Sequence, residues 1–415
     1  MAQVLAATAA PLQTDRPLLR NRTYLANLVG HSISIIGDGF HSVALGFWVL
    51  QATGSGTAMA TIMAVKAIVS VLLGPIAGTV ADRVDRRRLM MVMDIARLLL
   101  VGSMIPIIAL PKAPFLLLVI ISALIAASGT FAGPAFSASM INIVGKERIG
   151  QASGLNQMIW TAAQIIGPLA GGLVYATWGA KLSFGIDSAS YLVSFLAVLA
   201  GGRFASPKRE SAGPASFWGE LKEGLMAIRG HGLIRSTLVL APVINLFGSA
   251  LGVLIPVLAV KVWLVNAQQF GLLEGSAPVG FLLGAAFIMA MQAKLKRRGL
   301  WIGGGLAVAG LTIAMVGNVG FYVALPISIA SGIALAVVNV LFSIVLQQET
   351  PPELQGRVFG LLNAVAGAMG PIGMMLAGTL ADAASPALLT TLSGLGIVLV
   401  AVLGLLGQKD LRQYN

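Results

Sequence analysis

Several ionisable side chains of this sequence lie inside long apolar runs, where an isolated charge is costly to bury. Asp38 lies near the middle of the first run, and His41 follows it by one helical turn. Lys66 lies in the second run and Glu274 in the eighth. Because such groups mark ion or substrate pathways in membrane proteins, we predict that these four residues take part in proton coupling. A fixed structural ion pair, or an acid that only joins packed helices, is the alternative role for Asp38.

Asp38 and Lys66 are expected to be neighbours, because their runs are antiparallel and meet in a turn near residue 54. Their distances from that turn differ by about 6 Å of helix rise, which a lysine side chain can span. The sequence therefore predicts an Asp38–Lys66 pair. The alternative is a Lys66 side chain that extends outward to the membrane surface. Glu274 is either a second coupling acid or a contact for a cationic substrate.

Uncharged polar residues share one helical face with Asp38 in the first run, at about 100° per residue. A face turned toward lipid would not collect such groups, so we predict that this face lines an aqueous cavity. Other polar positions lie in the fifth run and in the second half of the chain. The predicted substrate-cavity residues are Asn27, His31, Ser34, Gln157, Trp160, Thr161, Gln164, Asn245, Asn339 and Ser343. A hydrogen bond between helices is the alternative role for each of them.

Three other charged residues receive different predictions. Asp94 and Arg97 lie three positions apart on one run, so they either pair with each other or join the basic loop that precedes them. Asp187 lies near the outer end of its run, and we expect water to solvate it.

Composition places the whole chain in lipid. Of its 415 residues, 57% are hydrophobic and 10% are charged, whereas a soluble domain has about 25% charged residues. There is no cysteine, so disulfides and thiolate metal sites are excluded. His31 and His41 are separated by about 15 Å of helix rise and cannot share one metal ion. With no H-E-x-x-H motif either, we expect no cofactor, no metal and no enzyme activity. No phosphate-binding G-x-x-x-x-G-K-[ST] loop occurs, so we expect energy from an ion gradient.

The apolar runs predict an all-α polytopic membrane protein with twelve transmembrane helices in two pseudo-symmetric six-helix halves. A span needs roughly 20 apolar residues. The predicted spans are 24–50, 58–81, 89–110, 114–144, 151–178, 182–202, 234–263, 268–293, 300–318, 321–348, 358–382 and 386–408. The halves are 1–202 and 234–415. The linker 203–233 is cytoplasmic and holds a short amphipathic helix, which lies on the membrane surface or packs on the protein's own cytoplasmic face.

Basic residues determine the predicted orientation. The net charge is +12, and most of the 27 Lys and Arg residues fall on one side of the predicted spans. Cytoplasmic loops carry this excess, so both termini are expected in the cytoplasm. The charge is therefore a topology signal, and we expect no nucleic-acid partner.

The loop between the second and third spans reads Gly78-Thr-Val-Ala-Asp82-Arg83-Val-Asp85-Arg86-Arg87-Arg88. It resembles the signature loop G-x-x-x-D-R-x-G-R-R of the major facilitator superfamily and departs from it at Asp85. The resemblance implies a charge lock that favours one state of an alternating cycle, and simple membrane anchoring by the arginines is the alternative. The predicted conformational-lock residues are Gly78, Asp82, Arg83, Arg86, Arg87, Asp94, Arg97, Glu147, Arg148, Glu349 and Arg357.

Further segments narrow the resemblance to bacterial exporters of macrolides and siderophores. They are Ile36-Gly37-Asp38-Gly39, the stretch from Glu349 to Gly360, Gly370-Pro371-Ile-Gly373, and Gly378-Thr-Leu-Ala-Asp382. The segment Gly167-Pro168-Leu-Ala-Gly171-Gly172 is similar to an antiporter motif, although Ala163 replaces its first glycine. Ordinary helix packing is the alternative explanation for these glycines.

The resemblance implies a secondary active transporter that exports its substrate from the cytoplasm. Together with the embedded charges it predicts proton-coupled efflux of a small amphipathic compound, such as a drug or siderophore, by alternating access. A lysophospholipid flippase or an importer of the same fold is the alternative. The expected partners are a small-molecule substrate, protons or Na⁺, and membrane lipid. We expect a monomer in the bacterial cytoplasmic (inner) membrane.

Overall fold

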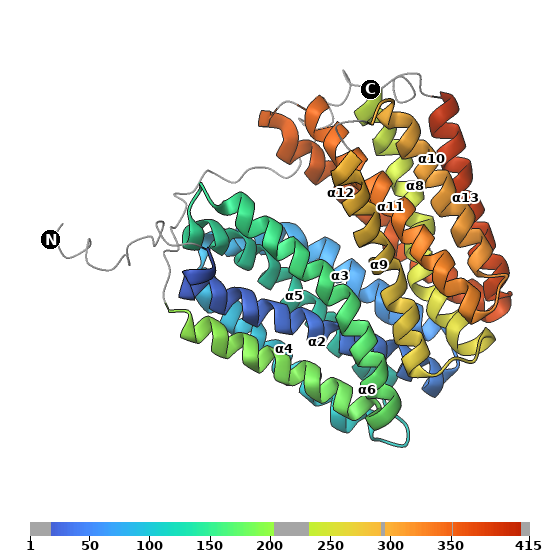
Figure 1. Cartoon of the computed structure of the whole chain (residues 1–415). Coiled ribbons are helices and arrows are strands. Elements are labelled where there is room, and N and C mark those ends of the chain that lie inside the picture. The colour runs from blue at the N-terminus through green and yellow to red at the C-terminus, as the bar shows by residue number, and fades with distance from the viewer. Residues whose placement is uncertain (1–17, 203–231, 292–294, 351, 408–415) are drawn as a thin grey trace. The chain divides into compact units, whose positions relative to one another are not determined.

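A computed structural model describes residues 18–202, 232–291, 295–350 and 352–407. Every regular element in these ranges is a helix (Figure 1). In chain order they are η2 (Leu18–Arg20), α2 (Arg22–Thr53), α3 (Gly56–Arg83), α4 (Arg86–Ile108), α5 (Phe115–Val144), α6 (Ile149–Ala200), α8 (Gly232–Val257), the π-helical η3 (Leu258–Val262), α9 (Ala267–Met291), α10 (Arg298–Val316), α11 (Phe321–Glu349), α12 (Pro352–Ala383) and α13 (Pro386–Gly407).

The predicted number of spans is confirmed for the described part of the chain. Eleven helices there are long and apolar enough to cross a membrane. Helix α6 has 52 residues, and an unbroken helix of that length would be about 78 Å long, far beyond a bilayer core of about 30 Å. Gly179 interrupts it with a φ of 81°, a conformation that glycine adopts without steric cost. Because α6 thus contains two spans, the total is twelve.

The surface of the helices confirms that the solvent is lipid. Leu72, Leu99, Leu116 and Leu406 are each at least 65% exposed. Soluble monomers rarely expose large contiguous apolar patches. Many serine hydroxyls inside the bundle instead bond to a carbonyl one turn earlier in their own helix, as Ser128 does with the carbonyl of Leu124. This satisfies polar groups where water is absent.

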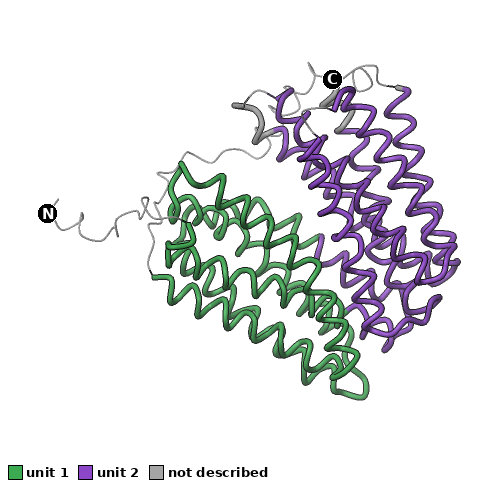
Figure 2. Tube along the Cα trace, viewed as in Figure 1, with its two compact units in different colours: residues 1–45, 68–212 green, residues 46–67, 213–415 purple. Residues whose placement is uncertain are grey.

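The chain forms two compact units (Figure 2). Unit 1 comprises residues 1–45 and 68–212, and unit 2 comprises 46–67 and 213–415. The start of α3 therefore groups with unit 2 and its remainder with unit 1. The predicted boundary segment 203–233 lies outside the described residues except for 232 and 233, so its surface helix stays a prediction.

Small residues set the helix spacing inside unit 2. Helix α11 packs against both α9 and α10, and α12 packs against α8. A Cβ on Gly284 would lie 2.6 Å from the carbonyl oxygen of Ile333, and one on Gly310 would lie 2.7 Å from that of Gly394. Backbones can approach this closely only where side chains are absent, which is how membrane helices gain packing contact.

Candidate functional site

Glycines on both sides of Asp38 place its helix directly against both parts of α6. A Cβ on Gly39 would lie 2.5 Å from the Cα of Gly167. A Cβ on Gly37 would overlap the side chain of Ser190 and lie 2.9 Å from Asp187 Oδ1. The backbone of the Ile36-Gly37-Asp38-Gly39 segment therefore lies against both parts of α6.

The segment that resembles an antiporter motif forms this crossing. Gly167, Pro168, Gly171 and Gly172 are all buried. A Cβ on Gly171 would lie 2.8 Å from the Cα of Phe40. These contacts account for the glycines by helix packing, and a role specific to antiport stays a prediction.

Asp38 has a defined partner in unit 1. The hydroxyl of Tyr191 donates a hydrogen bond to Asp38 Oδ1. The guanidinium carbon of Arg97 lies 5.3 Å from the centroid of the Tyr191 ring, and Arg97 interacts electrostatically with Asp38. Tyr191 is fully buried, whereas Asp38 is exposed. The pair expected with Lys66, which is partly buried in α3, stays a prediction.

Two buried acids complete this network. Ser194 Oγ donates to Asp94 Oδ2 over 2.8 Å, and His41 Nδ1 lies 3.1 Å from Asp187 Oδ2. Arg97 interacts electrostatically with Asp94 and Asp187 as well as with Asp38. We call Asp38, His41, Asp94, Arg97, Asp187, Tyr191 and Ser194 the unit 1 polar network.

One prediction about these acids needs correction. Asp187 is completely buried, so the expectation that water solvates it is wrong. The second part of α6 turns this side chain inward against His41 of α2, and a position near the end of a span does not reveal that rotation. Asp94 and Arg97 interact electrostatically with each other, as the first of the two predictions for them requires, and their part in the conformational lock stays a prediction. Their direct contacts are Ser194 and Tyr191.

The polar face predicted for α2 contains both buried and exposed residues. Asn27 and Ser34 are each 3% exposed, and each donates to a carbonyl of its own helix. The ring of His31 stacks on Phe136 with centroids 3.9 Å apart. Asp38, on the same face, is exposed, and the aqueous cavity stays a prediction.

The other predicted cavity residues are more accessible. Gln157, Trp160, Asn245 and Asn339 are exposed. Partly buried positions are Thr161, Gln164, Ser343 and the candidate acid Glu274. These residues belong to different units, and their contact with a substrate stays a prediction.

Arg86 fixes the loop between α3 and α4 inside unit 1. Its guanidinium donates to the carbonyl oxygens of Ala81 (3.2 Å) and Ala138 (3.0 Å) and to Asp82 Oδ1 (3.2 Å). Arg87 donates to the carbonyl oxygens of Val198 and Leu199 at the end of α6. These bonds join the start of α4 to the C-terminal parts of α3, α5 and α6. The helix dipole favours a positive charge at the carboxyl end of a helix.

The departure at Asp85 has a local explanation. Asp85 precedes α4, and its Oδ1 accepts from the backbone N–H of Arg88 over 2.8 Å. Aspartate is a favoured residue at such a helix N-cap.

The other members of the predicted lock lie at or near helix ends. Arg83 and Glu147 are exposed, Arg148 lies at the start of α6, and Glu349 ends α11. The side chain of Arg357 lies outside the described part of the structure.

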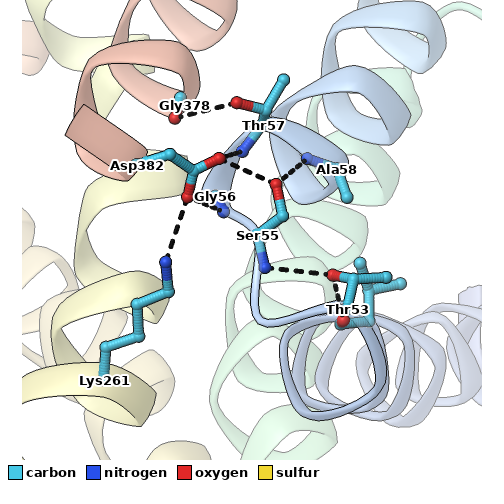
Figure 3. Close-up of polar contacts among 9 residues, drawn as sticks. Thr53, Ser55, Gly56, Thr57, Ala58, Lys261, Gly378 and Asp382 are labelled. Carbon is cyan, nitrogen blue, oxygen red and sulfur yellow. Dashed lines mark hydrogen bonds and ion pairs between the residues drawn. The ribbon is translucent and has the colours of Figure 1, made fainter.

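A second polar cluster, which the sequence prediction missed, surrounds Asp382 at the end of α12 (Figure 3). Its carboxylate accepts from Ser55 Oγ (2.8 Å) and from the backbone N–H groups of Gly56 (2.7 Å) and Thr57 (2.9 Å). Lys261 Nζ lies 3.0 Å away. All these residues belong to unit 2. A sequence signal existed, because Gly378-Thr-Leu-Ala-Asp382 has the same pattern as Gly78-Thr-Val-Ala-Asp82.

Comparison with known proteins identifies the family. The model of a major facilitator family described as transmembrane secretion effector matches residues 13–414. The chain belongs to this family. It is a multi-span membrane transporter, and the resemblance inferred from its motifs is confirmed.

Similar proteins include exporters. The chain is 22% identical to macrolide efflux protein A of Streptococcus pyogenes over 90% of this chain and 93% of that protein. It is 28% identical to the multidrug efflux pump Tap of Mycolicibacterium fortuitum over 84% and 86%, respectively. The crystal structure of a bacterial homologue of the iron transporter ferroportin has the same fold, with a TM-score of 0.74, 16% identity, and coverage of 94% of this chain and 99% of that one.

Proposed function

We propose that this transporter exports a small amphipathic compound from the cytoplasm in exchange for protons, and that Asp38 carries the proton. The observation behind the proposal is the unit 1 polar network, in which three carboxyl groups interact with one guanidinium inside the membrane-spanning helices. The efflux proteins to which the chain is similar support export as the direction.

The charges of the network favour proton uptake. Asp38, Asp94 and Asp187 carry up to three negative charges, while Arg97 supplies one positive charge and His41 supplies another only when protonated. A net negative charge in a low-dielectric interior is costly. Asp94 and Asp187 are buried, whereas Asp38 is exposed. Asp38 is therefore the most accessible carboxyl group of the network, and we infer that it is the one that exchanges protons with water.

Proton transfer to Asp38 would change its contacts. The neutral carboxyl group loses its Coulomb attraction to Arg97 and forms a weaker hydrogen bond with Tyr191. Because α2 contacts α6 through glycine backbone, a small shift of α2 changes contacts along both parts of α6. We infer that the protonated state opens toward one side of the membrane and the deprotonated state toward the other, with both termini in the cytoplasm.

The test is proton movement in proteoliposomes that enclose a pH-sensitive dye. A panel of amphipathic cations and catecholates is added to the wild type, to Asp38→Asn and to the control Asp85→Asn, which changes an exposed acid outside the network. We expect substrate-dependent proton flux in the wild type and the control. Asp38→Asn should allow downhill movement without accumulation against a gradient. Retained coupling in Asp38→Asn would assign the proton to another group, with Glu274 next. Accumulation in the opposite direction would favour an importer.

A further inference from the structure

The carboxylate of Asp382 joins parts of the chain that lie far apart in sequence (Figure 3). Ser55, Gly56 and Thr57 form the turn into α3, Lys261 lies in η3, and Asp382 lies at the end of α12. Four donors therefore converge on one carboxylate at distances of 2.7 to 3.0 Å.

The physical basis of this contact is the start of α3. The first N–H groups of a helix have no partner within the helix, and the helix dipole favours an anion at this end. The backbone N–H groups of Gly56 and Thr57 both point to Asp382. Lys261 provides the balancing charge. Hydrogen bonds with an ionised partner are about twice as strong as neutral ones.

Backbone contacts reinforce the same junction. Thr57 Oγ1 donates to the carbonyl oxygen of Gly378 over 3.3 Å. A Cβ on Gly378 would lie 2.7 Å from the carbonyl oxygen of Gly56 and would overlap the side chain of Ala60. Ala60 is completely buried. The junction thus covers the first turns of α3 closely.

The two ends of α3 use the same sequence pattern. Asp82 of Gly78-Thr-Val-Ala-Asp82 bonds to Arg86 at the end of α3, in unit 1. Asp382 of Gly378-Thr-Leu-Ala-Asp382 binds the start of α3, in unit 2. One continuous helix is therefore fixed at each end by an aspartate that follows a glycine by four residues.

We propose that Asp382 is a latch, which holds the start of α3 on α12 and η3 and must release each time the transporter opens at this end of its helices. The proposal rests on the proposed transport function for its purpose. Its structural claim is that the carboxylate of Asp382 determines how often the first turns of α3 separate from α12.

The test uses the absence of cysteine from the chain. In an Ala60→Cys background, the new thiol lies under the junction and should react slowly with a bulky polar maleimide. The reaction is measured on purified protein without substrate or a proton gradient. Asp382→Asn removes the charge and turns part of the acceptor into a donor, so the labelling rate should rise about tenfold. Lys261→Gln keeps the hydrogen bonds to the start of α3 and should give a smaller rise.

The matched control is Asp85→Asn in the same background, which should leave the labelling rate unchanged because asparagine caps a helix as well as aspartate does. If Asp382→Asn does not fold, Ser55→Ala decides, since it removes one donor and should still raise the rate. An unchanged rate in the folded variant, or an equal rise in the control, would overturn the latch. Failure of export alone would leave this result intact, because no substrate enters the measurement.

Discussion

Replacement of Arg86 by methionine tests what holds the loop between α3 and α4. Arg86 makes two bonds to backbone carbonyls and one to Asp82. Its side chain is 11% exposed, whereas that of Asp82 is 43% exposed. Methionine keeps much of the length and apolar contact of the arginine stem while removing every donor.

The expected magnitude follows from these contacts. A hydrogen bond from a charged donor contributes about 1.5–3 kcal/mol, and an exposed ion pair contributes about 0–1 kcal/mol. Loss of the two bonds to Ala81 and Ala138 should therefore lower the free energy of unfolding by about 3 kcal/mol or more. Asp82→Asn, which affects only the ion pair, should lower it by less than about 1 kcal/mol. Arg86→Lys should fall between these values, because one ammonium group cannot reach both carbonyls in the same geometry.

The assay is denaturant titration of the purified protein in detergent, in which the midpoint and slope give the change in free energy. The wild type and the three variants are compared at equal protein and detergent concentrations. Equal losses in Arg86→Met and Asp82→Asn would refute the reasoning, since the ion pair would then matter as much as the backbone bonds.

Four further predictions concern other parts of the molecule. Gly39→Val should cost about 1–3 kcal/mol of stability by overpacking in the same titration, whereas Gly185→Val, where a Cβ meets nothing within 4 Å, should cost less. Tyr191→Phe should slow proton-coupled transport in proteoliposomes without loss of fold, because only the donor to Asp38 is removed; an unchanged rate would exclude the hydroxyl from coupling. Asp82→Asn should slow transport while the protein stays folded, and a normal rate would mean that the loop serves only as an anchor. Ala212→Cys should not react with an impermeant thiol reagent in intact cells, and labelling there would reverse the predicted topology.

The sequence by itself determined the number, length and order of the membrane spans. This was possible because the bilayer fixes the length of an apolar run, and no partner helix is needed to read it. The merged helix α6 illustrates the point. The sequence placed a turn between residues 178 and 182, and the structure breaks the helix at Gly179.

The sequence also pointed to Asp38, because a carboxylate in the middle of an apolar run is visible without a structure. It did not reveal Tyr191 as the partner, because Tyr191 lies 153 positions away on another span. A helical wheel gives the direction of a side chain but not the helix it meets. For the same reason Asn27 and Ser34 looked like cavity residues, although both are buried and each donates to a carbonyl of its own helix.

Only the tertiary structure decided which charges meet. Asp187 became a buried partner of His41, because the rotation of α6 about its axis depends on glycine contacts with α2. Asp382 acquired its role from the start of α3, more than 300 positions earlier in the chain. Hydropathy and residue spacing can be read from the linear sequence, whereas these contacts depend on how the helices pack against one another. The spans could therefore be predicted from the sequence, and the partners of their charged residues could not.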